Sequence, residues 1–352
     1  MNKQVIAGAI MALVSAGATA QISIYGTVDT SLVGLNRFNP AGQSNKLVAS
    51  SVWLPSVFGF RGAEDLGGGL QANFNLESDL NTDTGSYAGG PNSLFRRAAT
   101  VGLSGEFGSF KFGRQLDHLF LQSFLNNIRL SHSGSAAVVG GLAYGLANAN
   151  TSSDANIFRS NVLQYQSPSM MGLTVTGQYS LGETAGDSRA NSAGTIGVNY
   201  AGFSGLDLNA VYQQSRNATG VTVSRNYLVG GKYSLGAATI ATSFTHYENP
   251  SLVGAPVDAN AIEIGGAYAI TPATSAAVNY VRFDDDVADV KPHVVSVSLK
   301  YNFSKRTSVW GLVVQTDGKG RVPLSNLYGA TVSGASFAGK STGTAIGITH
   351  QF

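Results

Sequence analysis

The chain contains no cysteine, and only 12% of its 352 residues are charged. The absence of cysteine excludes disulfide bonds, thiolate metal sites and a cysteine nucleophile. The formal net charge of +2 is nearly balanced, so bulk electrostatics indicates neither a nucleic-acid partner nor attraction to an anionic membrane surface. Forty-four glycines combined with so few charges favour turns and half-polar strands over amphipathic helices.

Long apolar runs are also missing beyond the first twenty residues. Those residues carry Lys3, the apolar stretch VIAGAIMALV and the small-residue sequence Ala18–Ala20, which is the pattern of a secretory signal peptide. The apolar stretch is short for a membrane anchor, which needs about 20 residues. We therefore expect residues 1–20 to be a cleaved signal peptide and residues 21–352 to form the exported protein without a transmembrane helix.

Strict alternation of apolar and polar residues is the main pattern of the remaining chain. In the stretch 293–303, Val295, Val297, Leu299 and Tyr301 share one face, and Ser296, Ser298 and Lys300 share the other. This period of two predicts a strand with one apolar and one wet side. The stretches LQANFNLES, GLDLNAVYQQ and NAIEIGGAYAI repeat the pattern, and strands of about ten residues suit a tilted crossing of a bilayer.

Five tyrosines recur just before expected turns, at intervals of 35, 33, 35 and 33 residues. One period accommodates two strands, a short turn and a longer loop. Short turns are expected near residues 66, 106, 170, 203, 236, 272 and 305. Seven such turns, with the first and last strands added, predict a sixteen-stranded antiparallel transmembrane β-barrel. The tyrosines, which precede the turns on the apolar face, predict an aromatic girdle at one membrane interface.

One interval departs from this period, because about 64 residues separate the turns near 106 and 170. The surplus must lie in the loop between about Gln115 and Arg159. Loops of this length in a regular fold are usually functional. This one is too apolar to extend freely into water, so we expect it to fold into the lumen.

A soluble β-sandwich or propeller would show the same alternation. The signal peptide, the asymmetry between short and long connections, and the terminal sequence AIGITHQF weigh against such a protein. In that terminal stretch Ile346, Ile348, His350 and Phe352 occupy one face, and the chain ends on an aromatic residue.

Several motifs together resemble the sixteen-stranded general porins of the Gram-negative outer membrane, in particular the beta-proteobacterial group. They are ISIYGTVD at the expected mature start, GFRGAEDLGGGL at 59–70, VGLSGEFGSFKFGRQ at 101–115, YNFSKRT at 301–307 and the terminal HQF. The resemblance covers the whole mature chain. It implies a homotrimer of water-filled barrels, with the third long loop in each lumen and an arginine cluster at the constriction.

The resemblance implies constriction residues position by position. Arg97 matches a wall arginine of the family, and alternation places it on the face of Ala99 and Val101. Glu77 matches the glutamate beside the arginines, and Arg61 matches a further lumen base. The chain departs from the pattern at two arginine positions, where it has Val57 and Phe158. Arg159 follows Phe158, but a shift of one residue points a side chain to the opposite face.

Alternation assigns nearly balanced charges to the lumen face. The bases are Arg61, Arg97, Lys111, Lys232 and Lys300, and the acids are Asp29, Glu77, Asp207 and Glu263. The inward loop adds Arg129 against Asp117 and Asp154. We expect Arg97 to be the dominant fixed charge of the constriction, with Glu77 partly compensating it. This arrangement predicts a weak anion preference.

No other motif predicts a catalytic, cofactor or metal site. The five histidines are scattered singly, without a partner at metal-ligand spacing. The sequence FDDDVAD at 283–289 could hold a divalent cation, but a solvated loop is favoured because the glycine and terminal glutamate of an EF-hand are missing. The triple glycine at 67–69 lies in a turn between strands and precedes no helix, unlike a phosphate-binding loop.

The sequence therefore predicts a passive channel for small hydrophilic solutes and ions in the outer membrane. Its expected partners are two further copies of the chain, outer-membrane lipid and lipopolysaccharide, with no nucleic acid and no cofactor. Two other functions stay open. A solute-specific channel would have a saturable binding site, and an adhesion or anchoring barrel would not conduct.

Overall fold

The computed structural model describes residues 21–87, 94–128, 157–249, 257–320 and 338–352. Within these residues the chain forms one continuous antiparallel sheet and a short helix. The strands are β1 (Gln21–Leu35), β2 (Asn45–Ser50), β3 (Val57–Gly67), β4 (Leu70–Asp79), β5 (Ala98–Gly105), β6 (Gly108–Leu116), β7 (Phe158–Gln166), β8 (Leu173–Ser180), β9 (Ala193–Phe203), β10 (Leu206–Arg216), β11 (Thr222–Leu235), β12 (Ala238–Asn249), β13 (Val257–Ala269), β14 (Thr274–Asp285), β15 (His293–Asn302), β16 (Thr307–Asp317) and β17 (Lys340–Gln351). The helix is α2 (His118–Leu125).

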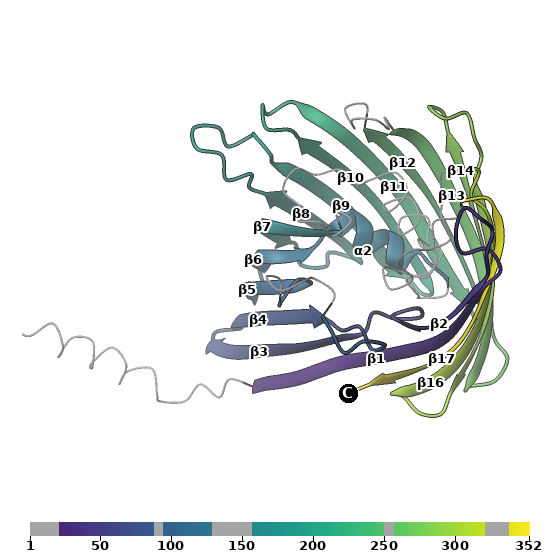
Figure 1. Cartoon of the computed structure of the whole chain (residues 1–352). Coiled ribbons are helices and arrows are strands. Elements are labelled where there is room, and N and C mark those ends of the chain that lie inside the picture. Colours follow the sequence, from purple (N-terminus) through teal and green to yellow (C-terminus); the bar gives the residue numbers. More distant parts are fainter. Residues whose placement is uncertain (1–20, 88–93, 129–156, 250–256, 321–337) are drawn as a thin grey trace, which may run out of the picture.

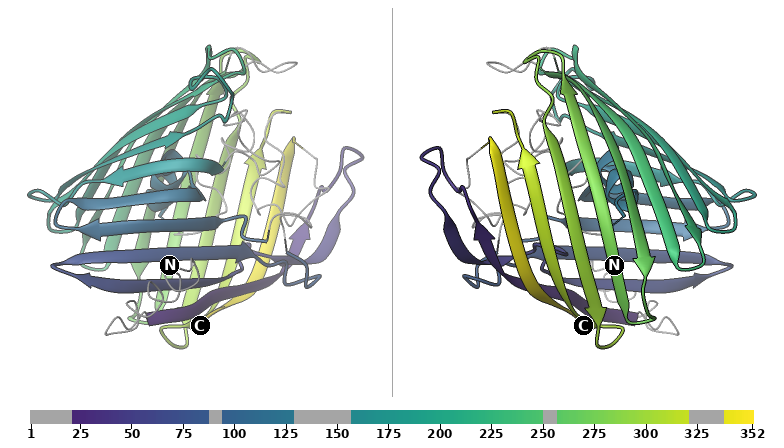
Figure 2. Two further views of the ribbon diagram at one scale, coloured as in Figure 1. Left: turned by 90° about the vertical axis from the view of Figure 1, so that its left-hand side faces the viewer. Right: turned by 90° about the vertical axis from the view of Figure 1, so that its right-hand side faces the viewer.

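The sheet closes on itself, and its seventeen strand segments make sixteen barrel strands. Each segment from β3 to β17 pairs with the next in antiparallel register, and β1 closes the ring by pairing with β17. The other edge of β1 pairs with β3 over Gln21–Thr27 and with β2 over Thr30–Leu35. Segments β2 and β3 are thus two halves of one interrupted barrel strand. The predicted sixteen-strand barrel is confirmed (Figures 1 and 2).

The side-chain alternation of the strands also agrees with the prediction. On β15, Val297 and Leu299 are 50% and 52% exposed, whereas Ser296 and Ser298 are buried. A water-soluble sandwich would bury its apolar face. Here the large aliphatic side chains point outward and the small polar ones inward, as the walls of a membrane barrel require.

The short turns lie at the predicted places. They fall between β3 and β4, β5 and β6, β7 and β8, β9 and β10, β11 and β12, β13 and β14, and β15 and β16. The tightest turns contain glycines such as Gly205 and Gly236, whose positive φ angles of 76° and 58° are unfavourable for other residues. All seven turns lie at the same end of the barrel, which we call the short-turn end.

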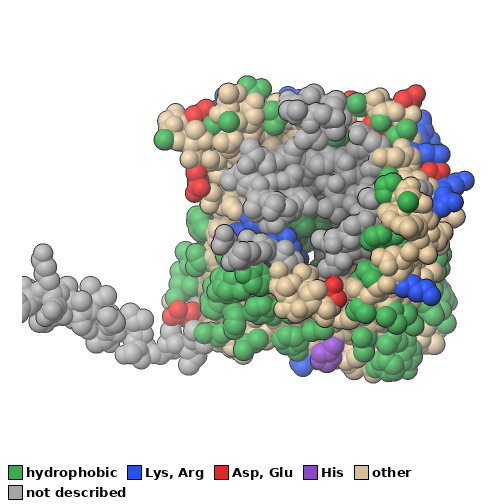
Figure 3. Space-filling model, viewed as in Figure 1, with side chains coloured by type: hydrophobic (Ala, Val, Ile, Leu, Met, Phe, Trp, Pro, Cys, Tyr) green, Lys and Arg blue, Asp and Glu red, His purple; other side chains and the backbone are tan. Residues whose placement is uncertain are grey.

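Aromatic side chains mark the outer surface near the short-turn end. Tyr165, Tyr233, Tyr268 and Tyr301 are all exposed there. Tyr165 packs on Phe110 with ring centroids 4.8 Å apart, which joins neighbouring strands across the outer surface. Figure 3 shows hydrophobic side chains gathered over the lower part of that view. Amphipathic rings at one level suit the boundary between hydrocarbon and headgroups.

The loop between β6 and β7 enters the barrel at its described beginning. Helix α2 contacts β9, β10 and β11 from inside, as Figure 1 shows. Asn126 and Asn209 exchange hydrogen bonds of 2.9 and 2.7 Å, and the Asn127 side chain donates to Glu263 at 2.8 Å. Residues 117–128 thus lie in the lumen. The rest of the predicted lumen loop lies outside the described residues, as do residues 1–20 of the predicted signal peptide.

A second inward feature is the interruption between β2 and β3, residues 51–56, which we call the inward hook. Asp29 of β1 accepts a hydrogen bond from the Trp53 backbone N–H at 3.0 Å and another from the Thr349 hydroxyl. The Ser56 hydroxyl donates to the Asp29 carbonyl at 3.0 Å. The Trp53 ring stacks on Trp310 of β16, with centroids 5.3 Å apart. These contacts hold the hook against the inside of the wall.

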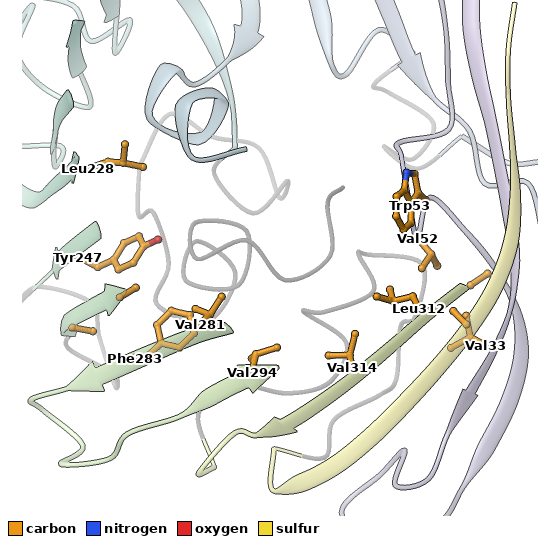
Figure 4. Packing of buried hydrophobic residues seen from close by; sticks show 14 of the residues in the cluster. Val33, Val52, Trp53, Leu228, Tyr247, Val281, Phe283, Val294, Leu312 and Val314 are labelled. Carbon is orange, nitrogen blue, oxygen red and sulfur yellow. The ribbon is translucent and has the colours of Figure 1, made fainter. Parts of the chain in front are cut away.

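The inner face of β11–β17 is unexpectedly apolar over part of its height. Figure 4 shows side chains of this cluster pointing from the strands toward the interior. The buried members include Leu228, Tyr247, Val281, Phe283, Val294, Leu312 and Val314. They alternate with lipid-facing residues such as Val313, so one stretch of wall is apolar on both faces. No helix in the described part of the chain is long and apolar enough to span a membrane.

Candidate pore constriction

A polar cavity of about 400 Å³ lies in the lumen between α2 and the wall from β4 to β9. Glu77, Arg97, Lys111 and His118 supply its ionisable side chains. The remaining lining is rich in amides: Asn75, Gln115, Gln122, Gln164, Gln166, Gln178 and Asn199. Figure 3 shows Lys and Arg side chains inside the opening of the molecule. Amide and hydroxyl groups can replace the hydration of a passing solute, and the ionisable groups set the local field.

Arg97 lies at the centre of an ion-pair network. Its Nε is 2.6 Å from Glu77 Oε1, and its Nη1 is 3.0 Å from Asp79 Oδ1. The Arg96 Nε donates to the other oxygen of Asp79 at 2.7 Å. Glu77 also accepts a hydrogen bond of 2.8 Å from the Tyr25 hydroxyl. Two arginines and two carboxylates are therefore mutually neutralised, and the Arg97 charge is compensated more fully than alternation predicts.

Phe158 forms the surface on which three arginines converge. The guanidinium carbons of Arg97, Arg96 and Arg114 lie 5.1, 5.8 and 6.0 Å from its ring centroid. Arg114 also donates to the Ser160 hydroxyl at 2.8 Å. An aromatic face attracts cations through its quadrupole. Position 158 therefore contributes no arginine of its own, but its aromatic ring lies close to three arginines from other positions.

Asp117 and Arg159 form a buried ion pair where the loop leaves the wall. The Asp117 carboxylate pairs with the Arg159 guanidinium, and their side chains are 0% and 2% exposed. The same carboxylate caps α2 by accepting the Leu119 backbone N–H at 2.9 Å. Removing one partner of a buried pair is costly, because the other charge stays uncompensated. This pair anchors the start of α2 and contributes little net charge to the pore.

The structure brings three of the seven predicted site residues together: Glu77, Arg97 and Lys111 line the polar cavity. Arg61 lies on the inner face opposite Asn75, with its guanidinium 4.8 Å from the Tyr25 ring centroid, outside that cavity.

Asp29 and Asp117 face inward but are fully buried, and both are used for internal hydrogen bonds. Arg129 lies outside the described residues, as does Asp154 of the same predicted loop. Among the further lumen charges, Asp207 and Lys232 pair with each other at 3.6 Å. Glu263 is buried and holds the Asn127 side chain. Alternation predicted that these side chains face inward. It did not predict which of them are buried by, or paired with, other residues.

The positions of Arg97 and Arg159 differ from those predicted by the sequence. Alternation placed Arg97 on the face of Ala99 and Val101, yet Val101 is an outward residue and Arg97 reaches the inner Glu77. Arg97 precedes β5, so the alternation of that strand does not govern it. Arg159 was expected on the face opposite Phe158. It instead turns to the loop residue Asp117, near a left-handed residue, Asn161, with φ of 57°.

Sequence reasoning missed Asp79, Arg96 and Arg114 as members of the constriction network. The doubled arginine in FRRAAT was a usable signal, since adjacent arginines can both face inward only outside regular strand geometry. Arg114 follows Gly113, whose φ of 117° accompanies a register shift between β6 and β7. Such an irregularity redirects the side chains beside it.

No group of three potential metal ligands comes together among the described residues. In the acidic stretch at 283–289, Asp284 pairs with Lys291 at 3.0 Å. Asp285 accepts the Ala288 backbone N–H at 2.9 Å within the turn. Both contacts join neighbouring residues of the same loop, as in an ordinary solvated loop.

Comparisons with known proteins agree with this architecture. The family described as Gram-negative porin matches residues 7–321. Outer membrane porin protein 32 of Delftia acidovorans is 28% identical over 358 residues, with all of both chains covered. The major outer membrane protein P.IB of Neisseria meningitidis serogroup B (strain H44/76) is 28% identical over 371 residues, again with full coverage.

Solved structures show the same fold. The anion-selective porin from Comamonas acidovorans superimposes with a TM-score of 0.77 at 23% identity, covering 95% of this chain and 100% of that one. The trimer form of OmpT from Vibrio cholerae gives a TM-score of 0.67 at 18% identity, covering 95% and 100%. With its closed barrel, inward helix and polar cavity, the chain belongs to the Gram-negative porin family and is a passive channel of the outer membrane.

Proposed function

We propose that the channel passes small hydrophilic solutes and ions with a weak preference for anions. The observation that carries this proposal is the composition of the polar cavity, where Arg97 and Lys111 face one lining carboxylate, Glu77. Asp79, which is not part of the cavity lining, neutralises part of the Arg97 charge. A small surplus of positive charge in a confined lumen raises the local concentration of anions.

The mechanism requires no chemical step. Helix α2 narrows the lumen and excludes large solutes, while the amide-rich wall offers hydrogen bonds in place of water. Charges act at short range in the constriction, where water is limited and a unit charge at about 4 Å contributes several times the roughly 1 kcal/mol that it contributes in bulk water. The ion pairs of Arg97 limit this field, which is why we propose a weak preference and free passage for neutral solutes.

We further propose that the mature protein starts near Gln21 after signal-peptide cleavage and assembles as a homotrimer. The Vibrio cholerae OmpT described as a trimer form supports the assembly by similarity of fold. The lipid-facing aliphatic side chains support contact with outer-membrane lipid and lipopolysaccharide. Migration of unboiled protein as a heat-dissociable trimer on a gel would support the assembly, and a monomer in mild detergent would contradict it.

Planar-bilayer recording under a salt gradient tests the ion preference directly. The native channel should give conductance steps in groups of three and a small reversal potential of the sign expected for anions. Arg97→Gln should reduce the anion-to-cation permeability ratio by about two- to fivefold, since one charge is removed at the constriction. Arg306→Gln is the matched control, because Arg306 is exposed in a short turn.

A strongly cation-selective native channel, or an Arg97→Gln channel with unchanged selectivity, would contradict this constriction. Saturating flux for a single solute class would favour the solute-specific channel. Failure to conduct at all would favour the adhesion or anchoring barrel.

A further inference from the structure

A second lumen cavity, of about 610 Å³, lies at the short-turn end beyond α2. It shares no described lining residue with the polar cavity. Trp53 and Leu54 of the inward hook line one side, and Phe124 and Ile128 at the end of α2 line another. Small side chains of β13 and β14 form the floor. The two inward features of the fold therefore meet across one largely apolar space.

Two lysines are the charged residues in the described lining of this cavity, and they differ in their ion pairing. The Lys232 ammonium is 3.6 Å from the Asp207 carboxylate. Lys300 makes no ion pair within the described residues, and its Nζ lies 6.0 Å from the Trp53 ring centroid. Lys300 also lies directly opposite Trp310 in the pairing of β15 with β16. Among the described residues, one ammonium without an ion-pair partner thus lies at the edge of an apolar and aromatic wall.

The aromatic part of the wall is preorganised. Trp53 and Trp310 stack with an interplanar angle of 28°, and the Trp310 Nε1–H donates to the Thr349 hydroxyl at 3.0 Å. The Trp53 backbone is fixed by Asp29. A ligand that binds beside this pair does not have to order it first, so less binding free energy is lost.

We propose that this cavity is a binding site for small aromatic carboxylates, which the Lys300 ammonium and the Trp53–Trp310 pair hold together. Ligand sites are mostly apolar, with a few polar groups that fix orientation, and this lining has that composition. The carboxylate pairs with Lys300, while the ring packs among Trp53, Phe124 and Ile128. The inference rests on the proposed channel function, because the solute reaches the site through the lumen.

Tryptophan emission gives a direct readout, because the chain contains two tryptophans and both form the stacked pair. The refolded full-length mature protein is titrated with benzoate in detergent micelles, exciting at the red edge of tryptophan absorption. Saturable change in emission is expected. Acetate, which lacks the ring, and benzyl alcohol, which lacks the charge, should each bind about tenfold more weakly or not at all.

Two lysine variants locate the site. Lys300→Gln should weaken benzoate binding about tenfold, as expected when a charge-assisted contact is lost. Lys232→Gln is the matched control, since it removes the same charge from the same cavity at a position already paired with Asp207. It should change benzoate affinity by less than about twofold. Conductance of each variant in planar bilayers verifies that the barrel is folded.

The outcomes separate this inference from the channel function. Conducting protein without a saturable benzoate response would overturn the site alone. Equal weakening by the two lysine variants would overturn it as well, because a general electrostatic field would then explain the binding. A protein that does not conduct, but binds benzoate with an affinity weakened more by Lys300→Gln than by Lys232→Gln, would contradict the channel function and support the binding site.

Discussion

The two halves of the inner wall differ in character although they belong to one sheet. From β4 to β9 the wall presents the amides and charges of the polar cavity. From β11 to β17 it presents buried aliphatic and aromatic side chains over part of its height, beside polar residues such as Ser296 and Ser298. The polar half has the composition of a solute path, and the apolar cluster in the other half has that of a soluble protein core. Alternation therefore predicts which residues face the lumen, but it does not predict that part of the inner face is apolar.

Replacing a large apolar side chain of the second half should produce the largest effect. Phe283 is 0% exposed on the inner face of β14. Phe283→Ala should lower the free energy of unfolding by about 3–5 kcal/mol through loss of burial and the cavity left behind. Urea unfolding of the refolded protein measures this. Phe244→Ala, at an outward position that is 42% exposed, should cost much less, and an equal cost would contradict a core-like inner wall.

The contact between α2 and the wall can be disturbed at a single glycine. A Cβ on Gly197 of β9 would lie 2.5 Å from the His118 ring, so Gly197→Ala must displace that buried ring at the start of α2. We expect a loss of about 1–3 kcal/mol from overpacking, together with altered single-channel conductance. Gly177→Ala on the adjacent strand has open space at that position and serves as control. Unchanged conductance in the Gly197 variant would show that the position of the His118 ring does not define the passage.

A charge change in the polar half should affect selectivity more than stability. Glu77→Gln removes the lining carboxylate, while Asp79 stays paired with Arg97. The anion preference should increase by about twofold to threefold, measured as reversal potential under a salt gradient. Glu106→Gln, an exposed substitution in a short turn, should leave it unchanged. A decrease in anion preference would mean that the Glu77 carboxylate does not face the permeating ions.

The smallest expected effect is a dependence of stability on pH through His118. Burial lowers the pKa of His118 below its usual 6.5, and the neighbouring Asp117 only partly opposes this. The unfolded chain then takes up a proton at a pH where the folded protein does not. Stability contributed by neutral His118 should be lost as pH falls below about 6.5, by at most about 1.4 kcal/mol per pH unit.

Urea midpoints at about pH 7 and about pH 5.5 measure this slope. The variant His118→Gln should show a smaller change between the two conditions. An identical change in both proteins would assign the pH dependence to other groups.

Much of the fold was predictable because strand pairing and membrane contact impose a strict period on the sequence. Alternation, the recurring tyrosines and the turn residues gave the strand number, the turns and the position of the long loop. The interruption between β2 and β3 was not predicted. Pro55 was its signal, since proline cannot donate to a ladder and rarely lies within a central strand.

The site was less predictable, because a period of two reports the face of a residue but not what covers it. Glu77 and Lys111 were placed correctly on the inner face by the strand pattern. Asp29 and Asp117 also face inward, but internal hydrogen bonds to the hook and to α2 bury them. Such coverage depends on segments far apart in the sequence, which no local pattern reveals.

The hydrogen bonds of Asp29 link the inward hook to the closure of the barrel. One oxygen of this carboxylate holds Trp53, and the other accepts the hydroxyl of Thr349 on the last strand. Thr349 reaches Asp29 only when β1 and β17 are paired. The hook is therefore fully bonded only after the two ends of the chain have met. The stack of Trp53 on Trp310 is thus supported by a contact that exists only in the closed barrel, and its tryptophan emission can report barrel closure.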